Sequence, residues 1–234
     1  MQLIEVSDLG VRSAMIRLRR RDSPLRFVLF PMIHVGAPSF YTEVARRLRT
    51  FDLVVAEGIR GPSAATRTIT RSYRLYGARN RDGLTVQSID YQSLGVPVLF
   101  PDLDANTFEA SWNRLPLSLR LQLTALFSLG GLGLRLFGSR ETVARHAEVD
   151  DLPSREDVEA RADPRFGPLL EIVGDERDAP LLRALERIHD ERHDEAIQVA
   201  VVYGAGHMGA VVHHLDRKFR YWAGDAEWLT VFER

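Results

Sequence analysis

Short apolar runs that end in a polar residue constrain the fold of this chain more than any other feature. Three of them lead to residues of a type used in active sites, and they span Phe27 to His34, Asp52 to Glu57 and Val199 to His207. An apolar run of this length, followed by an amphipathic stretch, is typical of a buried parallel strand that leads into a helix. Ligands of α/β proteins bind at the carboxyl ends of such strands. We therefore expect the two histidines and the glutamate to converge on one site.

The order of the predicted elements indicates an α/β fold. Strand and helix patterns alternate at first, a helical stretch follows from Ala105 to about Ile172, and the alternation then returns. This order predicts a single domain over residues 1–234, in which helices flank a central mixed, mostly parallel sheet and a helical insertion, 105–172, separates its halves. We also predict helices over 64–76 and 86–94, and an edge hairpin made by 219–222 and 228–232.

The composition excludes several classes of protein. With 45% hydrophobic and 27% charged residues the chain can bury a core, and its net charge of −1 argues against a nucleic-acid partner. The absence of cysteine excludes disulfides, thiolate metal ligands and a cysteine nucleophile. We expect no organic cofactor. The N-terminal residues lack the pattern of a signal peptide, so the expected location is the cytoplasm.

Residues 115–137 form an unusually apolar segment. Its clean run, from Leu123 to Leu134, is shorter than the ~20 residues that span a bilayer, so we expect no membrane association. Gly130, Gly131 and Gly133 predict a buried helix that ends near residue 129, followed by a bend and a short continuation. We expect this segment to cover the strand ends, where it lines a substrate pocket or the contact of a homodimer.

The other five histidines lie in charged or helical stretches and are predicted to be surface or helix-face residues: His146, His189, His193, His213 and His214. The spacing of His189 and His193 would suit a metal ion. Their neighbours are polar on every side, however, which favours a solvated helix face.

Taken in order, the motifs resemble those of the TraB family, which includes the pheromone-shutdown proteins and is related to the TIKI proteases. The resemblance covers nearly the whole chain. It rests on the segments Pro31–His34, Val55–Glu57, Asp102–Asp104, Glu176–Asp178 and Gly204–His207. The family has glycine where this chain has Pro31, which leaves the histidine of that motif in place but alters the local turn.

The resemblance implies a hydrolase whose catalytic residues are His34, Glu57, His207 and Arg177. It also implies residues that support this site or bind the substrate, namely Asp102, Asp104, Glu176, Asp178, Gly204 and Gly206. The TIKI proteins are described as metal-dependent proteases that use the two histidines and the glutamate. The more distant erythromycin-esterase-like proteins use the same arrangement without a metal.

Three interpretations of the chemistry stay open. The first is metal-dependent hydrolysis of a peptide or amide bond, with Mn, Co or Zn held by His34, Glu57 and His207. The second is metal-free hydrolysis, in which one histidine is the general base for water and Glu57 orients it. The third is a protein without catalytic activity that binds a peptide or small molecule in the same cleft.

Arg177 has two candidate roles in a catalytic site. Its guanidinium would stabilise an oxyanion or orient Glu57 through its fork of donors. The alternative is a structural role, in which Glu176, Arg177 and Asp178 form the first-turn charge cluster of a helix with an internal salt bridge.

Overall fold

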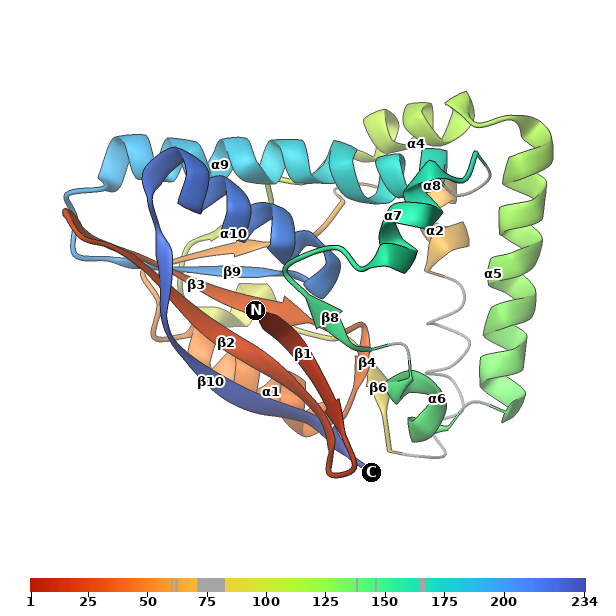
Figure 1. Cartoon of the computed structure of the whole chain (residues 1–234), viewed down its shortest axis with the longest axis horizontal. Helices are drawn as coiled ribbons and strands as arrows, with labels where there is room; N and C mark the ends of the chain where they lie inside the picture. Colours follow the sequence, from red (N-terminus) through yellow and green to blue (C-terminus); the bar gives the residue numbers. More distant parts are fainter. Residues whose placement is uncertain (60, 62, 71–82, 138, 146, 165–166) are drawn as a thin grey trace.

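The fold is α/β, with a mixed, curled central sheet flanked by helices, as the sequence predicts (Figure 1). The computed structural model describes residues 1–59, 61, 63–70, 83–137, 139–145, 147–164 and 167–234. The strands of the main sheet follow the order β7-β5-β9-β3-β2-β1-β8, and β10 pairs with β2. Their bounds are β1 (Gln2–Ser7), β2 (Gly10–Arg20), β3 (Ser23–Met32), β5 (Leu53–Ala56), β7 (Val98–Leu99), β8 (Val149–Asp150), β9 (Gln198–Gly204) and β10 (Trp222–Glu233).

One half of the sheet is parallel and positions the candidate site. Strand β9 lies between β3 and β5 and runs parallel to both, and β7 runs parallel to β5. The carboxyl ends of these four strands therefore share one edge of the sheet. A separate pair, β4 (Val35–Gly36) and β6 (Thr85–Val86), lies directly after β3 in the chain and forms a second, two-stranded sheet.

The other half of the sheet is antiparallel and corrects one prediction. Strand β2 pairs with β10 along one edge, and its other edge pairs with β1 near its start and with β3 near its end. The predicted hairpin is wrong, because β10 is one continuous strand. The register shifts between Ala223 and Asp225, so Gly224 forms a bulge and not a turn.

The helices confirm the alternating pattern in most places. They are α1 (Pro38–Leu48), α2 (Ala64–Ile69), α4 (Ala105–Arg114), α5 (Leu117–Phe137), α6 (Arg140–Ala144), α7 (Arg155–Ala162), α8 (Gly167–Leu170), α9 (Glu176–Arg192) and α10 (Ala205–Phe219), with a 3₁₀ helix η1 (Tyr91–Leu94) and a π-helix η2 (Glu171–Asp175). Most of the helix predicted over 86–94 is wrong: Val86 pairs in β6, and only η1 is helical. Of the helix predicted over 64–76, residues 71–76 lie outside the described part of the chain.

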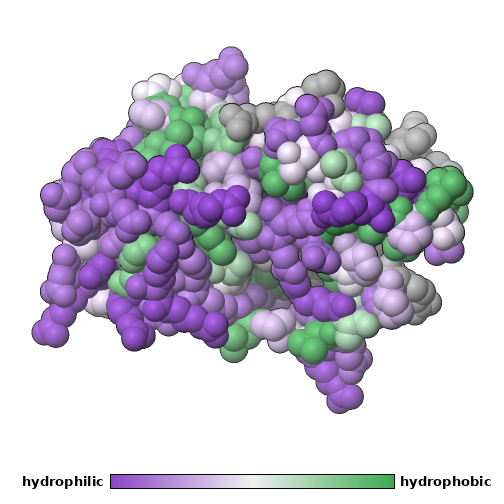
Figure 2. Space-filling model, turned by 90° about the horizontal axis from the view of Figure 1, so that it is seen from above, coloured by the Kyte–Doolittle hydropathy of each residue, from purple (hydrophilic) through white to green (hydrophobic). Residues whose placement is uncertain are grey.

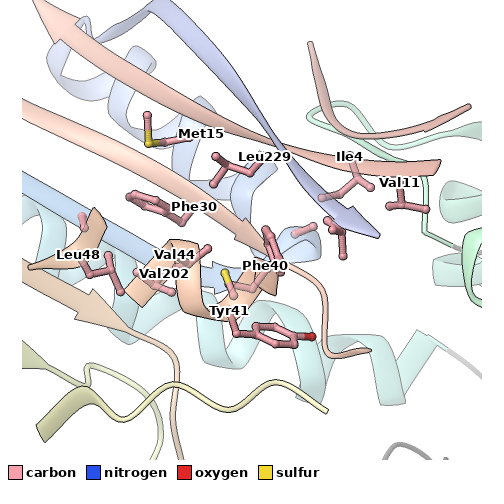
Figure 3. Packing of buried hydrophobic residues seen from close by; sticks show 14 of the residues in the cluster. Ile4, Val11, Met15, Phe30, Phe40, Tyr41, Val44, Leu48, Val202 and Leu229 are labelled. Carbon is pink, nitrogen blue, oxygen red and sulfur yellow. The ribbon is translucent and has the colours of Figure 1, made fainter. Parts of the chain in front are cut away.

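Each face of the sheet is covered by helices, which makes three layers. The alternation along β9 sends Ala200 and Val202 toward α1, and Val199, Val201 and Tyr203 toward α9 and α10. Figure 3 shows the first of these cores, in which side chains of α1 pack beneath the sheet. Full burial of one such aliphatic or aromatic side chain stabilises the fold by roughly 1.5–3 kcal/mol. The two cores fix the strand ends that carry the site.

The insertion lies beyond the carboxyl ends of the parallel strands, on the right of Figure 1. Helices α2, α4, α5 and α8 and the π-helix share a core of their own, made of Ala65, Phe108, Trp112, Leu115, Leu123, Leu169 and Ile172. The insertion is not purely helical, because β8 adds to the edge of the main sheet beside β1. This pairing attaches the insertion to the sheet.

Helix α5 differs from the prediction in two ways. It continues through all three glycines without the predicted bend, although each glycine costs a helix roughly 1 kcal/mol relative to alanine. Its described part is also not a buried helix: Leu123 is 2% exposed, whereas Leu121 is 62% exposed. Two residues apart on a helix, these side chains point to nearly opposite sides, so only one stripe reaches the core.

The outer stripe of α5 gives the molecule an apolar edge. Four of its leucines are more than half exposed, namely Leu117, Leu121, Leu126 and Leu129. Figure 2 shows hydrophobic residues at the right-hand edge, where α5 lies, beside a mostly hydrophilic face over α9. Among the described residues, no helix combines the length and the hydropathy needed to cross a membrane.

Candidate active site

The three predicted residues converge around Gly204, at the end of the central strand β9. His34 follows β3, Glu57 follows β5 directly, and His207 lies in the first turn of α10. A Cβ atom placed on Gly204 would lie 3.3 Å from Glu57 Oε2, 3.6 Å from His207 Cδ2 and 3.8 Å from His34 Nε2. The predicted convergence is confirmed. It also explains the glycine, because a side chain there would fill the space between the three groups.

Glu57 is held from two sides. Its Oε2 accepts a hydrogen bond from the backbone N–H of Gly204 at 2.8 Å, and its Oε1 accepts one from Arg177 Nη2 at 2.6 Å. Burial raises the pKa of this carboxyl, but the charges of Arg177, His207 and His34 and the Gly204 N–H outweigh it and lower the pKa to about 2. Glu57 is therefore an anion at neutral pH.

Arg177 joins Glu57 to Asp102. Its Nε and Nη2 donate to the two oxygens of Asp102 at 3.1 and 2.6 Å, a bidentate contact. Asp102 also accepts from the backbone N–H groups of Gly58 and Leu103. Burial lowers the pKa of the guanidinium, but the two carboxylates outweigh it and raise that pKa overall. Because Nε and Nη2 both donate to carboxylates, the geometry favours the role of orienting Glu57.

Asp178 fixes the orientation of His207. Its Oδ1 lies 2.6 Å from Nδ1 of the imidazole, and both residues are buried. A carboxylate only accepts, so Nδ1 carries the proton and Nε2 of the neutral ring is left as a base. This Nε2 lies 3.8 Å from Glu57 Oε1, beyond direct hydrogen-bonding range. The separation is one at which a water molecule bridges polar groups.

Gln87 has the corresponding position beside His34. Its Oε1 lies 3.3 Å from Nδ1 of that imidazole, and its backbone N–H donates to the carbonyl of His34. An amide oxygen at this place directs the protonated nitrogen of a neutral ring to Nδ1. The sequence did not single out Gln87. It reaches the site because β6 pairs with β4, a non-local contact that leaves no periodic signal in so short a strand.

Glu176, Arg177 and Asp178 reach two different parts of the molecule. Glu176 accepts from Ser111 and Arg114 of α4, whereas Arg177 and Asp178 point to the sheet edge. The predicted internal salt bridge is therefore wrong, although Glu176 and Asp178 do lie in the first turn of α9. The three residues open α9, as the motif predicts, and the π-helix η2 leads directly into it. Short π-helical turns of this kind are frequent at functional sites.

Two of the predicted supporting residues do not reach the site. Asp104 is exposed and caps α4, where it accepts from the backbone N–H groups of Asn106 and Thr107. Glu176 attaches α4 to α9, as described above. Gly206 is exposed next to His207, and a Cβ atom on it would meet nothing within 4 Å, so its predicted role stays a prediction. The contacts of the site include Asp102, Asp178 and Gly204 from the predicted set.

His189 also corrects a prediction. It is 5% exposed, its ring packs 4.0 Å from that of Phe219, and its two nitrogens contact Tyr221 and Arg20. The polar neighbours in the sequence suggested a solvated face, but His189 lies one turn beyond Leu185 and shares its buried stripe. Two of the other histidines are half-buried on α10, where they contact Asp151 and Glu186. His146 lies outside the described residues.

His34, Glu57 and His207 are residue types that bind divalent metal ions, but their arrangement in this site suits a metal ion poorly. Both oxygens of Glu57 already accept hydrogen bonds, one of them from a cationic guanidinium that would repel a metal ion beside it. Within the described part of the chain, no group of three or more histidine, aspartate and glutamate side chains is placed to hold a metal ion. The geometry therefore fits acid–base chemistry by the side chains themselves more closely.

Comparisons with known proteins add no assignment. A scan against protein-family models, a search of curated proteins and a search of solved structures each find no match. Membership of the TraB family accordingly stays a prediction from the motifs, and the candidate chemistry rests on the geometry of the site.

Proposed function

We propose that this chain is a hydrolase in which water, activated by His207, attacks a carbonyl group at the edge of the sheet. The observation that carries the proposal is the connected series Asp178–His207–Glu57–Arg177. It supplies a base of fixed tautomer, an anion beside that base, and a cation that keeps the anion in place. The expected substrate is a peptide or amide, from the resemblance to the TIKI proteases, with an ester as the alternative.

The first step forms the tetrahedral intermediate. A water molecule between His207 and Glu57 gives a proton to Nε2 of His207, and its oxygen forms a bond to the carbonyl carbon of the substrate. The π electrons of the carbonyl move to its oxygen. Asp178 and Glu57 flank the imidazolium that results, and their negative charges stabilise it. General-base help of this kind is worth about 10²–10⁴ in rate.

The second step breaks the scissile bond. The electron pair on the oxyanion re-forms the carbonyl, the bond from carbon to the leaving nitrogen or oxygen breaks, and the imidazolium of His207 returns its proton to that atom. The products are a carboxylic acid and an amine or alcohol. His34 follows β3, which lies on the opposite side of β9 from the strand that ends before Glu57, and we assign it to hold the leaving group.

Metal-dependent hydrolysis is the second candidate function, and one observation favours it. Both imidazoles have an oxygen acceptor at Nδ1, from Asp178 and from Gln87, which is how metal-bound histidines are oriented in proteins. His34, Glu57 and His207 would hold Mn, Co or Zn, and the ion would supply a more acidic water. The metal content of protein purified without a histidine tag separates the two candidates, because only the second requires a stoichiometric ion.

A panel of fluorogenic peptides, amides and esters tests the proposed function. The variant is His207→Asn, because its amide nitrogen can still donate to Asp178 but cannot take up a proton. The matched control is His214→Ala, a histidine on the same helix that contacts Glu186. We expect the wild-type protein and the control to turn over a substrate and His207→Asn to lose that turnover. A wild-type protein that binds a panel member without turnover would favour the third interpretation, a binding protein.

A further inference from the structure

Two buried tyrosine hydroxyls near the site have no hydrogen-bond partner within the described residues. They belong to Tyr91, in η1, and to Tyr203, in β9. A buried polar group without a partner costs about 1–3 kcal/mol, so such groups are rare and call for a reason. The Tyr91 hydroxyl experiences the charge of Glu57, and the Tyr203 hydroxyl those of Asp102, Glu57, Arg177 and Asp178. The two tyrosines differ in exposure: Tyr203 is 0% exposed, whereas the side chain of Tyr91 is half-buried.

Tyr91 is tied to two of the site residues. Its ring packs edge-to-face against Phe100 at 5.5 Å between centroids, and Phe100 approaches Gly58, which follows Glu57. Tyr91 also follows Gln87 by four residues, and Gln87 contacts His34 through both its side chain and its backbone. Tyr91 thus packs on the face of the sheet that α1 covers, near enough to Glu57 for its hydroxyl to experience that charge, whereas Tyr203 is buried in the core on the opposite face.

The proposed reaction lacks one part that Tyr91 can supply. A tetrahedral intermediate carries a negative oxygen and needs a hydrogen-bond donor placed to receive it. Arg177 was a candidate for this role, but its Nε and Nη2 donate to Asp102 and Glu57. We propose, on the basis of the proposed function, that the Tyr91 hydroxyl donates a hydrogen bond to the carbonyl oxygen of the substrate and stabilises the oxyanion.

The surroundings of the hydroxyl suit a donor. Burial and the negative charge of Glu57 raise the pKa of Tyr91. The side-chain amide of Gln87, which approaches the hydroxyl as a donor, opposes them only in part, so the group keeps its proton at neutral pH. The side-chain oxygen of Gln87 contacts His34 and does not accept from Tyr91. A protonated, buried hydroxyl that has no acceptor among the described residues keeps its hydrogen-bond donor for a substrate oxygen.

The test compares Tyr91→Phe with Tyr203→Phe on the substrate that the panel identifies. Both changes remove one buried, unpartnered hydroxyl and leave the ring. Neither should lower the melting temperature, because no protein hydrogen bond is lost. We expect Tyr91→Phe to lower kcat by about 10²–10³-fold, the effect of removing one oxyanion donor, with KM and the pH profile little changed. Tyr203→Phe should turn over substrate like the wild-type protein.

Each other outcome has a separate meaning. Wild-type turnover that Tyr91→Phe retains in full would overturn the assignment of Tyr91 and leave the proposed function standing. A loss of kcat in Tyr91→Phe that comes with a shifted pH profile, and that Gln87→Ala reproduces, would also overturn it, because the hydroxyl would then act through Gln87 and His34. An inactive wild-type protein with an intact fold would overturn the proposed function and this assignment together.

Discussion

Replacing Arg177 by methionine should destabilise the protein strongly. The side chains of Arg177, Glu57 and Asp102 are 13, 12 and 0% exposed, so the change leaves two carboxylates buried without their cation. Breaking a buried pair by removing one partner costs about 3–5 kcal/mol. In a chain of this length 1 kcal/mol shifts the melting temperature by roughly 2–4 °C. We therefore expect Arg177→Met to lower the melting temperature by about 6–20 °C.

The matched control is Arg192→Met on the same helix. Arg192 pairs with Glu195 at the surface, and exposed pairs of this kind contribute about 0–1 kcal/mol. Thermal unfolding followed by circular dichroism at neutral pH measures both variants against the wild-type protein. If Arg177→Met melted within a degree or two of the control, the reasoning that the buried cation offsets the burial of two carboxylates would be refuted.

Acid should reduce the difference between Arg177→Met and the wild-type protein. The pKa of Glu57 lies below its ordinary value, near 2 instead of 4.5. A depressed pKa of this kind stabilises the native state above about pH 4.5, and the contribution is lost as the pH falls toward 2. Once the carboxylates are protonated, the loss of the guanidinium leaves less charge uncompensated. If the difference in melting temperature between Arg177→Met and the wild-type protein stayed constant as the pH fell toward 2, the assignment of Glu57 as the partner of Arg177 would be contradicted.

Three further predictions concern single residues. Asp178→Asn should lower kcat by about 10²–10⁴-fold in the panel assay, since an amide no longer fixes the tautomer of His207. Unchanged turnover would show that the contact between Asp178 and His207 has no part in catalysis. Leu123→Ala should cost about 2–5 kcal/mol in urea unfolding and Leu121→Ala less than about 0.5, because only the first side chain is buried; equal costs would contradict the orientation of α5. Burial and the charge of Arg20 lower the pKa of His189, so the neutral ring should stabilise the fold above about pH 6.5, and this stabilisation should be lost as the pH falls. If the free energy of unfolding of His189→Gln had the same pH dependence as that of the wild-type protein, the lowered pKa of His189 would be contradicted.

The sheet edge could be predicted from the sequence because buried strands have a strong local signature. The strand residues just before His34, Glu57 and His207 are almost all apolar, as is typical of strands covered on both faces. Their parallel order then places the three polar ends at one edge. Asp178 was identified only through the family motif, since its role depends on how α9 packs against α10.

The errors have a common physical cause, which is that non-local contacts decided the outcome. Gly224 suggested a turn, but pairing with β2 over its whole length keeps β10 extended. The polar neighbours of His189 suggested a solvated face, yet packing against Phe219 and Tyr221 buries it. The glycines of α5 suggested a bend, but the helix continues through them. Gln87 and Tyr91 were missed for the same reason, because only the pairing of β4 with β6 brings them to the site.

The central claim is that His207, oriented by Asp178, activates water for hydrolysis. The most direct measurement is the turnover number per folded molecule of wild-type protein and His207→Asn on the best peptide, amide or ester substrate, with both preparations made without a histidine tag. The account predicts turnover by the wild-type protein and a loss of about 10²–10⁴-fold in the variant, at an unchanged circular dichroism spectrum. Equal turnover by the two proteins, or none by a folded wild-type protein on any member of the panel, would contradict it.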